Sequence, residues 1–62
     1  MPEVVVFAIE GRSQDQKRAL MKEITDAVVK NCKVDVGAVT VSIMETAKVN
    51  KSKGGIPFSE RK

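Results

Sequence analysis

Residues 4–9 read VVVFAI, and this stretch decides the fold. Val, Ile and Phe favour β-strands, and here both alternating faces of the stretch are apolar. A strand with one face in water would alternate apolar with polar residues, whereas a strand in a parallel sheet is covered on both faces. We therefore predict a strand over residues 4–9 that is buried on both sides.

The segment after this strand predicts an amphipathic helix that begins near Gln14. Ser13 and Gln16 have the spacing of a capping box, in which each side chain binds the other residue's backbone amide. Further along, mostly apolar residues recur at spacings of three and four and define a face that we expect to be buried. Its members are Leu20, Ile24, Ala27, Val28 and Asn31, flanked by Met21 and Cys32.

A second strand is predicted after the turn-like residues 33–38 (KVDVGA). Residues 39, 41 and 43 are Val, Val and Ile, and they alternate with Thr40, Ser42 and Met44 before Glu45. A strand, a helix and a second strand in this order form a crossover unit with parallel strands, and the helix covers one face. The fold class is therefore α+β, a small β-α-β unit with parallel strands.

The C-terminal part predicts a short edge segment within the same domain. Residues 46–53 are polar and irregular, Gly54 and Gly55 permit a tight turn, and residues 56–58 (Ile-Pro-Phe) suit a sheet edge because proline cannot donate to a ladder. The sequence contains no internal repeat or linker. We expect residues 1–62 to form one domain.

Nothing predicted within the chain covers the second face of the sheet. A 62-residue chain that folds alone buries only about 60% of its unfolded surface, so its core is marginal. One Cys cannot form an internal disulfide, and the absence of His excludes a Cys/His zinc site, so we expect no metal. We therefore expect the fold to be completed by oligomerisation.

Charge and hydropathy restrict the partners. Residues 46–62 hold five basic residues and one acidic residue, a net charge of +4, whereas residues 1–45 have a net charge of −1, so the overall excess of +3 lies in the tail. This basic tail suits phosphates, acidic lipids or small carboxylates, or is simply a solvated surface. The longest apolar stretch has six residues against the ~20 of a membrane helix. No basic segment precedes it as in a signal peptide, so we expect a cytoplasmic protein without a membrane partner. With Phe7 and Phe58 as the only aromatic residues, nucleic-acid binding is also disfavoured.

Without His, a catalytic base must come from elsewhere, and Pro2 is a candidate. Removal of Met1 would leave Pro2 with a secondary amine at the edge of an apolar strand. Desolvation and nearby cations lower the pKa of such an amine, which can then act as a base. Cys32 has no activating base nearby in the sequence, so we interpret it as a packing residue.

Several of these features together resemble the 4-oxalocrotonate tautomerase family of the tautomerase superfamily. The resemblance spans the whole chain and rests on Pro2, residues 9–13 (IEGRS), Gln16-Lys17, Glu45 and Gly54-Gly55. It implies an isomerase that acts on enol or dienol carboxylic acids without a cofactor. It also implies a hexamer, a trimer of dimers, with N-terminal prolines in pockets built from neighbouring subunits.

The resemblance assigns roles to three residues. Pro2 falls on the amine that shuttles the proton, and Arg12 falls on the arginine that binds a substrate carboxylate, a task that suits the planar guanidinium. Ile9 falls on a position whose backbone contributes to the pocket. An ion pair of Arg12 with an acid such as Glu10 or Glu45, or with an acid of a neighbouring subunit, is the alternative role.

The sequence departs from the family at two positions. Thr40 stands where the family has a second arginine, which polarises the substrate carbonyl in a neighbouring subunit's site, and Lys51 stands in place of an aromatic wall. Loss of such a cation commonly costs about a hundredfold in rate, which predicts an inefficient enzyme.

These departures leave three hypotheses. The chain is a homohexameric tautomerase in which Lys51 or Lys53 replaces the arginine, one subunit of a heterohexamer whose partner supplies it, or a non-catalytic binding or assembly protein. Activity of the pure chain separates the first from the others.

Overall fold

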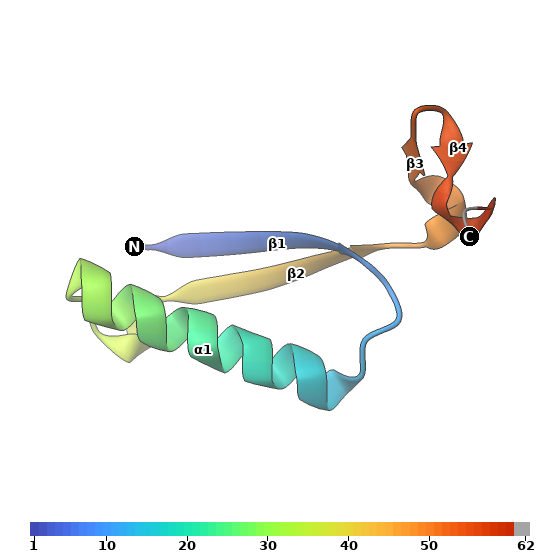
Figure 1. The fold of residues 1–62 in the computed structure, drawn as a ribbon. Coiled ribbons are helices and arrows are strands. Elements are labelled where there is room, and N and C mark those ends of the chain that lie inside the picture. The colour runs from blue at the N-terminus through green and yellow to red at the C-terminus, as the bar shows by residue number, and fades with distance from the viewer. Residues whose placement is uncertain (61–62) are drawn as a thin grey trace.

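The structure, a computed structural model, describes residues 1–60. It contains β1 (Glu3–Ile9), α1 (Gln14–Cys32) and β2 (Thr40–Thr46), followed by the short strands β3 (Ser52–Lys53) and β4 (Ile56–Pro57). Single 3₁₀ turns occupy Val36–Ala38, Lys48–Asn50 and Phe58–Glu60. In Figure 1 the helix runs along one side of the β1–β2 pair and the short hairpin lies beyond one end of it. The predicted β-α-β unit with a C-terminal edge is confirmed.

β1 and β2 pair in parallel along their full lengths, as predicted. The register runs from Glu3 opposite Thr40 to Ile9 opposite Thr46. Side chains of paired residues in a parallel sheet share a face, so β1 and β2 have one face toward the helix and one away from it. β2 begins one residue later than the alternation predicts, because Val39 ends the preceding 3₁₀ turn with its amide on the Val36 carbonyl at 3.3 Å.

The helix starts where the sequence predicts. Ser13 Oγ accepts from the Gln16 amide at 3.1 Å, and Gln16 Oε1 accepts from the Ser13 amide at 2.9 Å, which completes the capping box. The helix ends at Cys32 and is capped by Lys33, a left-handed residue with φ 55° whose amide donates to the Val29 carbonyl.

The buried side of the helix is rotated from the predicted one. Ile24, Val28 and the flanking Met21 are partly covered as expected, but Leu20, Ala27, Asn31 and Cys32 are exposed, so Cys32 is not a packing residue within the single chain. The partly covered residues also include Lys17, Thr25 and Val29. Two overlapping stripes of residues three and four apart exist on this helix, and contact with the sheet selects one of them.

The face of the sheet away from the helix is uncovered. Val5, Phe7 and Met44 are 45%, 74% and 53% exposed on it, and no residue among 1–60 is buried. The chain measures 43 × 23 × 14 Å with a radius of gyration of 14.7 Å, against roughly 11 Å for a compact domain of this length. The single chain thus leaves the second face of its sheet uncovered, as the sequence predicts for a chain completed by oligomerisation.

The C-terminal segment forms a hairpin rather than an irregular loop. β3 and β4 pair antiparallel, with Ser52 opposite Pro57 and Lys53 opposite Ile56. Gly54 and Gly55 connect them with φ of 63° and 84°, and two successive positive φ angles are what a type I′ turn requires. No helix within residues 1–60 is long and apolar enough to cross a membrane.

Candidate active site

Pro2 lies at the start of β1 and is partly covered. Its carbonyl accepts a hydrogen bond from the Thr40 amide at 3.1 Å, which ties the residue to the beginning of β2. Met1 extends beyond it and is 94% exposed. Thr40, one of the two residues that depart from the family pattern, is therefore beside Pro2 of its own chain.

Arg12 lies beyond the other end of β1, in the loop that joins β1 to α1. The loop turns at Gly11, whose φ of 132° suits glycine alone. The Arg12 Nη1 donates to the Ile9 carbonyl at 3.0 Å, so the structure brings these two candidate site residues together through the Ile9 backbone. This contact places the guanidinium at the strand end, and no carboxylate within residues 1–60 forms an ion pair with it. The alternative of an Arg12 ion pair with Glu10 or Glu45 is therefore not found in the single chain.

The Arg12 loop is attached at both ends. The Glu10 amide donates to the Thr46 carbonyl at 3.1 Å, which continues the β1–β2 ladder by one bond. At the other end, the capping box fixes Ser13 at the start of α1. Because both ends of this four-residue loop are hydrogen-bonded, the backbone of Arg12 has a defined position.

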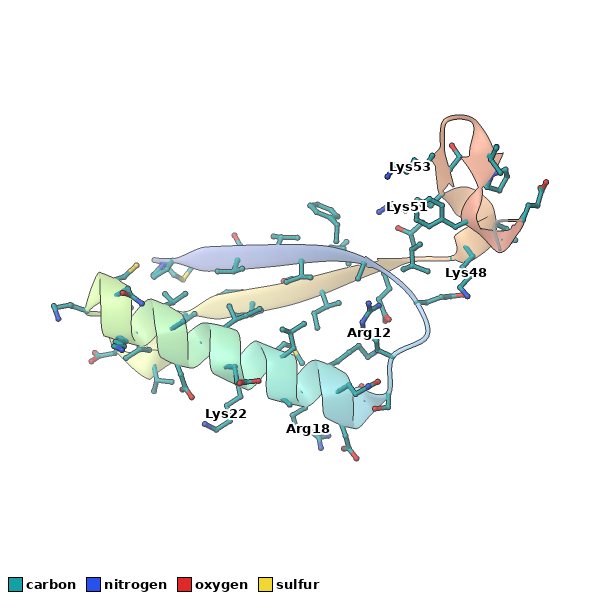
Figure 2. All side chains as sticks on the ribbon, viewed as in Figure 1. Arg12, Arg18, Lys22, Lys48, Lys51 and Lys53 are labelled. Carbon is teal, nitrogen blue, oxygen red and sulfur yellow. The ribbon has the colours of Figure 1, made fainter. Side chains whose placement is uncertain are left out.

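Lys51 precedes the hairpin, between the 3₁₀ turn of Lys48–Asn50 and β3. It is partly covered, and its carbonyl accepts from the Phe58 amide at 2.8 Å. Figure 2 shows Lys48, Lys51 and Lys53 around the hairpin, with Arg12 at the same end of the β1–β2 pair. Lys48, Lys51 and Lys53 thus lie at the Arg12 end of the molecule.

The structure does not bring Pro2 near Arg12 or Lys51 within one chain. The two sets lie at opposite ends of the β1–β2 pair (Figures 1 and 2), and seven residue steps at ~3.3 Å each put roughly 23 Å between Pro2 and Ile9. No pocket is present within the described part of the single chain. A site that contains both Pro2 and Arg12 therefore needs at least two chains.

One contact in this region was not predicted from the sequence, an ion pair between α1 and β2. Lys17 Nζ lies 2.9 Å from Glu45 Oε1, and both side chains are about three-quarters covered, with 22% and 26% exposed. Two signals could have indicated it: Lys17 is four residues before Met21 on the covered side of the helix, and Glu45 continues the alternation of Val41 and Ile43 toward the helix.

Comparison with known sequences gives a consistent result along the chain. A family described as "Tautomerase enzyme" matches residues 2–61. A probable tautomerase of Bradyrhizobium diazoefficiens is 48% identical over 61 residues, which cover 98% of this chain and 91% of the relative. The 2-hydroxymuconate tautomerase of Pseudomonas putida is 33% identical over 60 residues, covering 97% and 95% of the two chains.

A solved structure supports the fold. A chain of a heterohexamer 4-oxalocrotonate tautomerase from Chloroflexus aurantiacus superposes with a TM-score of 0.90 at 27% identity, and the match covers the whole of both chains. The similarity extends over the candidate site residues at both ends of β1 as well as over the C-terminal hairpin.

Proposed function

This chain belongs to the tautomerase family, and we propose that it isomerises enol or dienol carboxylic acids with the Pro2 amine as general base. Removal of Met1 exposes that amine. The neutral amine accepts the proton of the substrate's enol hydroxyl, the double bonds shift, and the amine returns the proton to a carbon of the substrate. The product is the corresponding ketone, so no atom is gained or lost and no redox partner is needed.

Arg12 binds a carboxylate of the substrate in this proposal. The guanidinium has five N–H donors, and the one hydrogen bond to the Ile9 carbonyl leaves donors for a carboxylate. Its freedom from any ion pair with a described acid is the observation that carries the proposal. An arginine held by a backbone carbonyl at a strand end is oriented yet not neutralised, and it can pair with an incoming anion.

The complete site is proposed to form between chains. Because Pro2 and Arg12 lie at opposite ends of β1, Pro2 of one subunit meets Arg12 of another in an assembly that covers the apolar face of Val5, Phe7 and Met44. A homohexamer provides such contacts. Lys51 or Lys53 supplies the second cation that the family has at the position of Thr40.

A second candidate is that this chain is one of two unlike subunits in a heterohexamer. The likeness to a chain of the Chloroflexus aurantiacus heterohexamer favours it, and so does Thr40, which carries no charge at the position of the second arginine. In that case the pure chain lacks activity until its partner is added. A non-catalytic binding or assembly protein of the same fold would stay inactive in both conditions.

One experiment tests the proposal. The purified chain, with removal of Met1 checked by intact mass, is mixed with 2-hydroxymuconate, and loss of the dienol is followed by ultraviolet absorbance. Ketonisation well above the buffer rate, strongly lowered by Pro2→Ala, is expected. Turnover left intact by Pro2→Ala overturns the role of Pro2, and an inactive pure chain overturns the homomeric enzyme.

A further inference from the structure

The ion pair of Lys17 and Glu45 differs from the other ion pairs found within residues 1–60. It joins α1 to β2 across 28 positions of the sequence, whereas Arg18–Asp15 and Lys22–Asp26 are pairs within the helix. The Lys17 and Glu45 side chains are 22% and 26% exposed, against 61–93% for the members of the other two pairs. Its charges are therefore the least screened by solvent of the three pairs.

The two residues of this pair flank the Arg12 loop, residues 10–13: Lys17 follows its helix end and Glu45 lies beside its strand end. The Lys17 amide donates to the carbonyl of Ser13, the last residue of the loop, at 3.1 Å. On the strand side, Glu45 precedes Thr46, whose carbonyl accepts from the Glu10 amide at the first residue of the loop. The Lys17–Glu45 ion pair thus connects the two elements, α1 and β2, to which the two ends of loop 10–13 are hydrogen-bonded.

Glu45 is also a potential competitor for Arg12. Its register partner in β1 is Ala8, the residue before Ile9, and Arg12 binds the Ile9 carbonyl. An ionised carboxylate so near the strand end offers a guanidinium the same interaction as a substrate carboxylate does. In the structure Glu45 is bound to Lys17 at 2.9 Å instead.

We infer that Lys17 is a positioning residue for Arg12: by binding the Glu45 carboxylate, it keeps Glu45 from pairing with Arg12 and so leaves Arg12 available to an anionic ligand. The inference rests on the proposed function for the identity of that ligand, a carboxylic acid. It assigns Lys17 no contact with the substrate itself.

Binding of cis,cis-muconate tests this inference. This conjugated dicarboxylate has no enol hydroxyl and therefore binds without reacting. Titration calorimetry on the assembled protein should show a Kd about three- to fivefold higher for Lys17→Met, the size of effect that one partly covered ion pair produces. Lys17→Arg keeps the cation and should bind as the native protein does. Lys22→Met, which removes an exposed ion pair of similar length from the same helix, is the matched control and should leave the Kd unchanged.

Removing the competitor should restore binding. Adding Glu45→Gln to Lys17→Met should return the Kd to the native value, because the amide no longer attracts the guanidinium. A merely structural ion pair predicts the opposite, since the double variant lacks the contact altogether. An unchanged Kd in Lys17→Met, or no recovery in the double variant, overturns the inference.

A second measurement separates failure of this inference from failure of the proposed function. The Arg12 Nε–H resonance in ¹⁵N NMR should shift in Lys17→Met and return in the double variant, whatever ligand Arg12 binds. If Arg12→Ala leaves muconate binding intact, the proposed carboxylate role is wrong, while the resonance still reports whether Glu45 reaches Arg12. A resonance that does not move in Lys17→Met overturns the inference.

Discussion

Pro2 and Arg12 lie beyond opposite ends of the same strand, β1, with Pro2 held by the Thr40 amide and Arg12 held on the Ile9 carbonyl. β1 is straight in Figure 1, so Pro2 and Arg12 of one chain cannot share a site. Each chain therefore contributes half of two sites in the proposed assembly, and this arrangement makes the function testable by mixing chains.

Mixed assemblies should be more active than either parent at a substrate concentration below the native KM. Pro2→Ala and Arg12→Ala chains, each with strongly reduced turnover at that concentration, are unfolded together and refolded so that subunits mix. Sites that combine a native Pro2 from one chain with a native Arg12 from the other then regain turnover of 2-hydroxymuconate. Each variant refolded alone is the control. Absence of recovery, with mixing verified by native mass spectrometry, would mean that both residues act from one chain.

Arg12→Ala should raise KM for an enol acid more than it lowers stability. Loss of hydrogen bonds to a charged group predicts a rise of about ten- to a hundredfold. Arg18→Ala is the matched control, because Arg18 is an exposed arginine of the first turns of α1 that pairs with Asp15. Steady-state kinetics and a thermal melt of both variants decide. An unchanged KM with a lower melting temperature would assign Arg12 a structural role.

Thr40→Arg should increase turnover. Thr40 is exposed, and its contact with Pro2 is made by the backbone amide, which any side chain preserves. A guanidinium at this position adds a cation for the developing enolate, and a gain of about tenfold or more in kcat is expected. Thr40→Lys is the comparison variant and should gain less, since an ammonium lacks the planar fork. No gain from either variant would show that the side chain does not reach a site.

Phe7→Glu should dissociate or unfold the protein. Phe7 is 74% exposed in the centre of the uncovered sheet face, and an unpaired carboxylate buried there by assembly costs several kcal/mol. Ala19→Glu places the same charge on an exposed position of the helix and serves as control. Sedimentation at micromolar concentration gives the mass of each. A native-sized assembly of Phe7→Glu would place the interface elsewhere.

Gly11→Ala should lower stability and weaken carboxylate binding together. No atom lies within 4 Å of the position a Cβ would take, so the penalty comes from the backbone φ of 132° alone. We expect a cost of at least about 1 kcal/mol. Gly37→Ala also meets no atom within 4 Å and has no positive φ, and it should be neutral or stabilising. Equal melting temperatures for the two variants would mean that the loop accommodates another conformation.

The features that local sequence decides were predictable. The apolar run of residues 4–9 and the Ser13–Gln16 spacing gave the first strand and the helix start, and the Gly54-Gly55 pair gave the turn. Two-residue strands such as Ser52–Lys53 are too short to show a period, so the hairpin was missed. The helix face was rotated because two overlapping stripes satisfy the same spacing.

The residues of the candidate site were proposed from the sequence, whereas their geometry was not. Pro2 was proposed for its amine, and Ile9, Arg12 and Lys51 for the resemblance, but the sequence alone does not show that β1 separates Pro2 from the others. The Lys17–Glu45 contact depends on the register that places Glu45 opposite Ala8 and toward the helix. Such contacts between distant positions follow from tertiary structure and leave little trace in local patterns.

The lack of any buried residue among 1–60 has a thermodynamic consequence. A chain whose apolar surface is covered only by other copies gains most of its stability at the moment of association, so folding and assembly are one equilibrium governed by mass action. Dilution alone should then lower the melting temperature. In the proposed assembly, the concentration of the protein, as much as its sequence, sets the fraction that is folded.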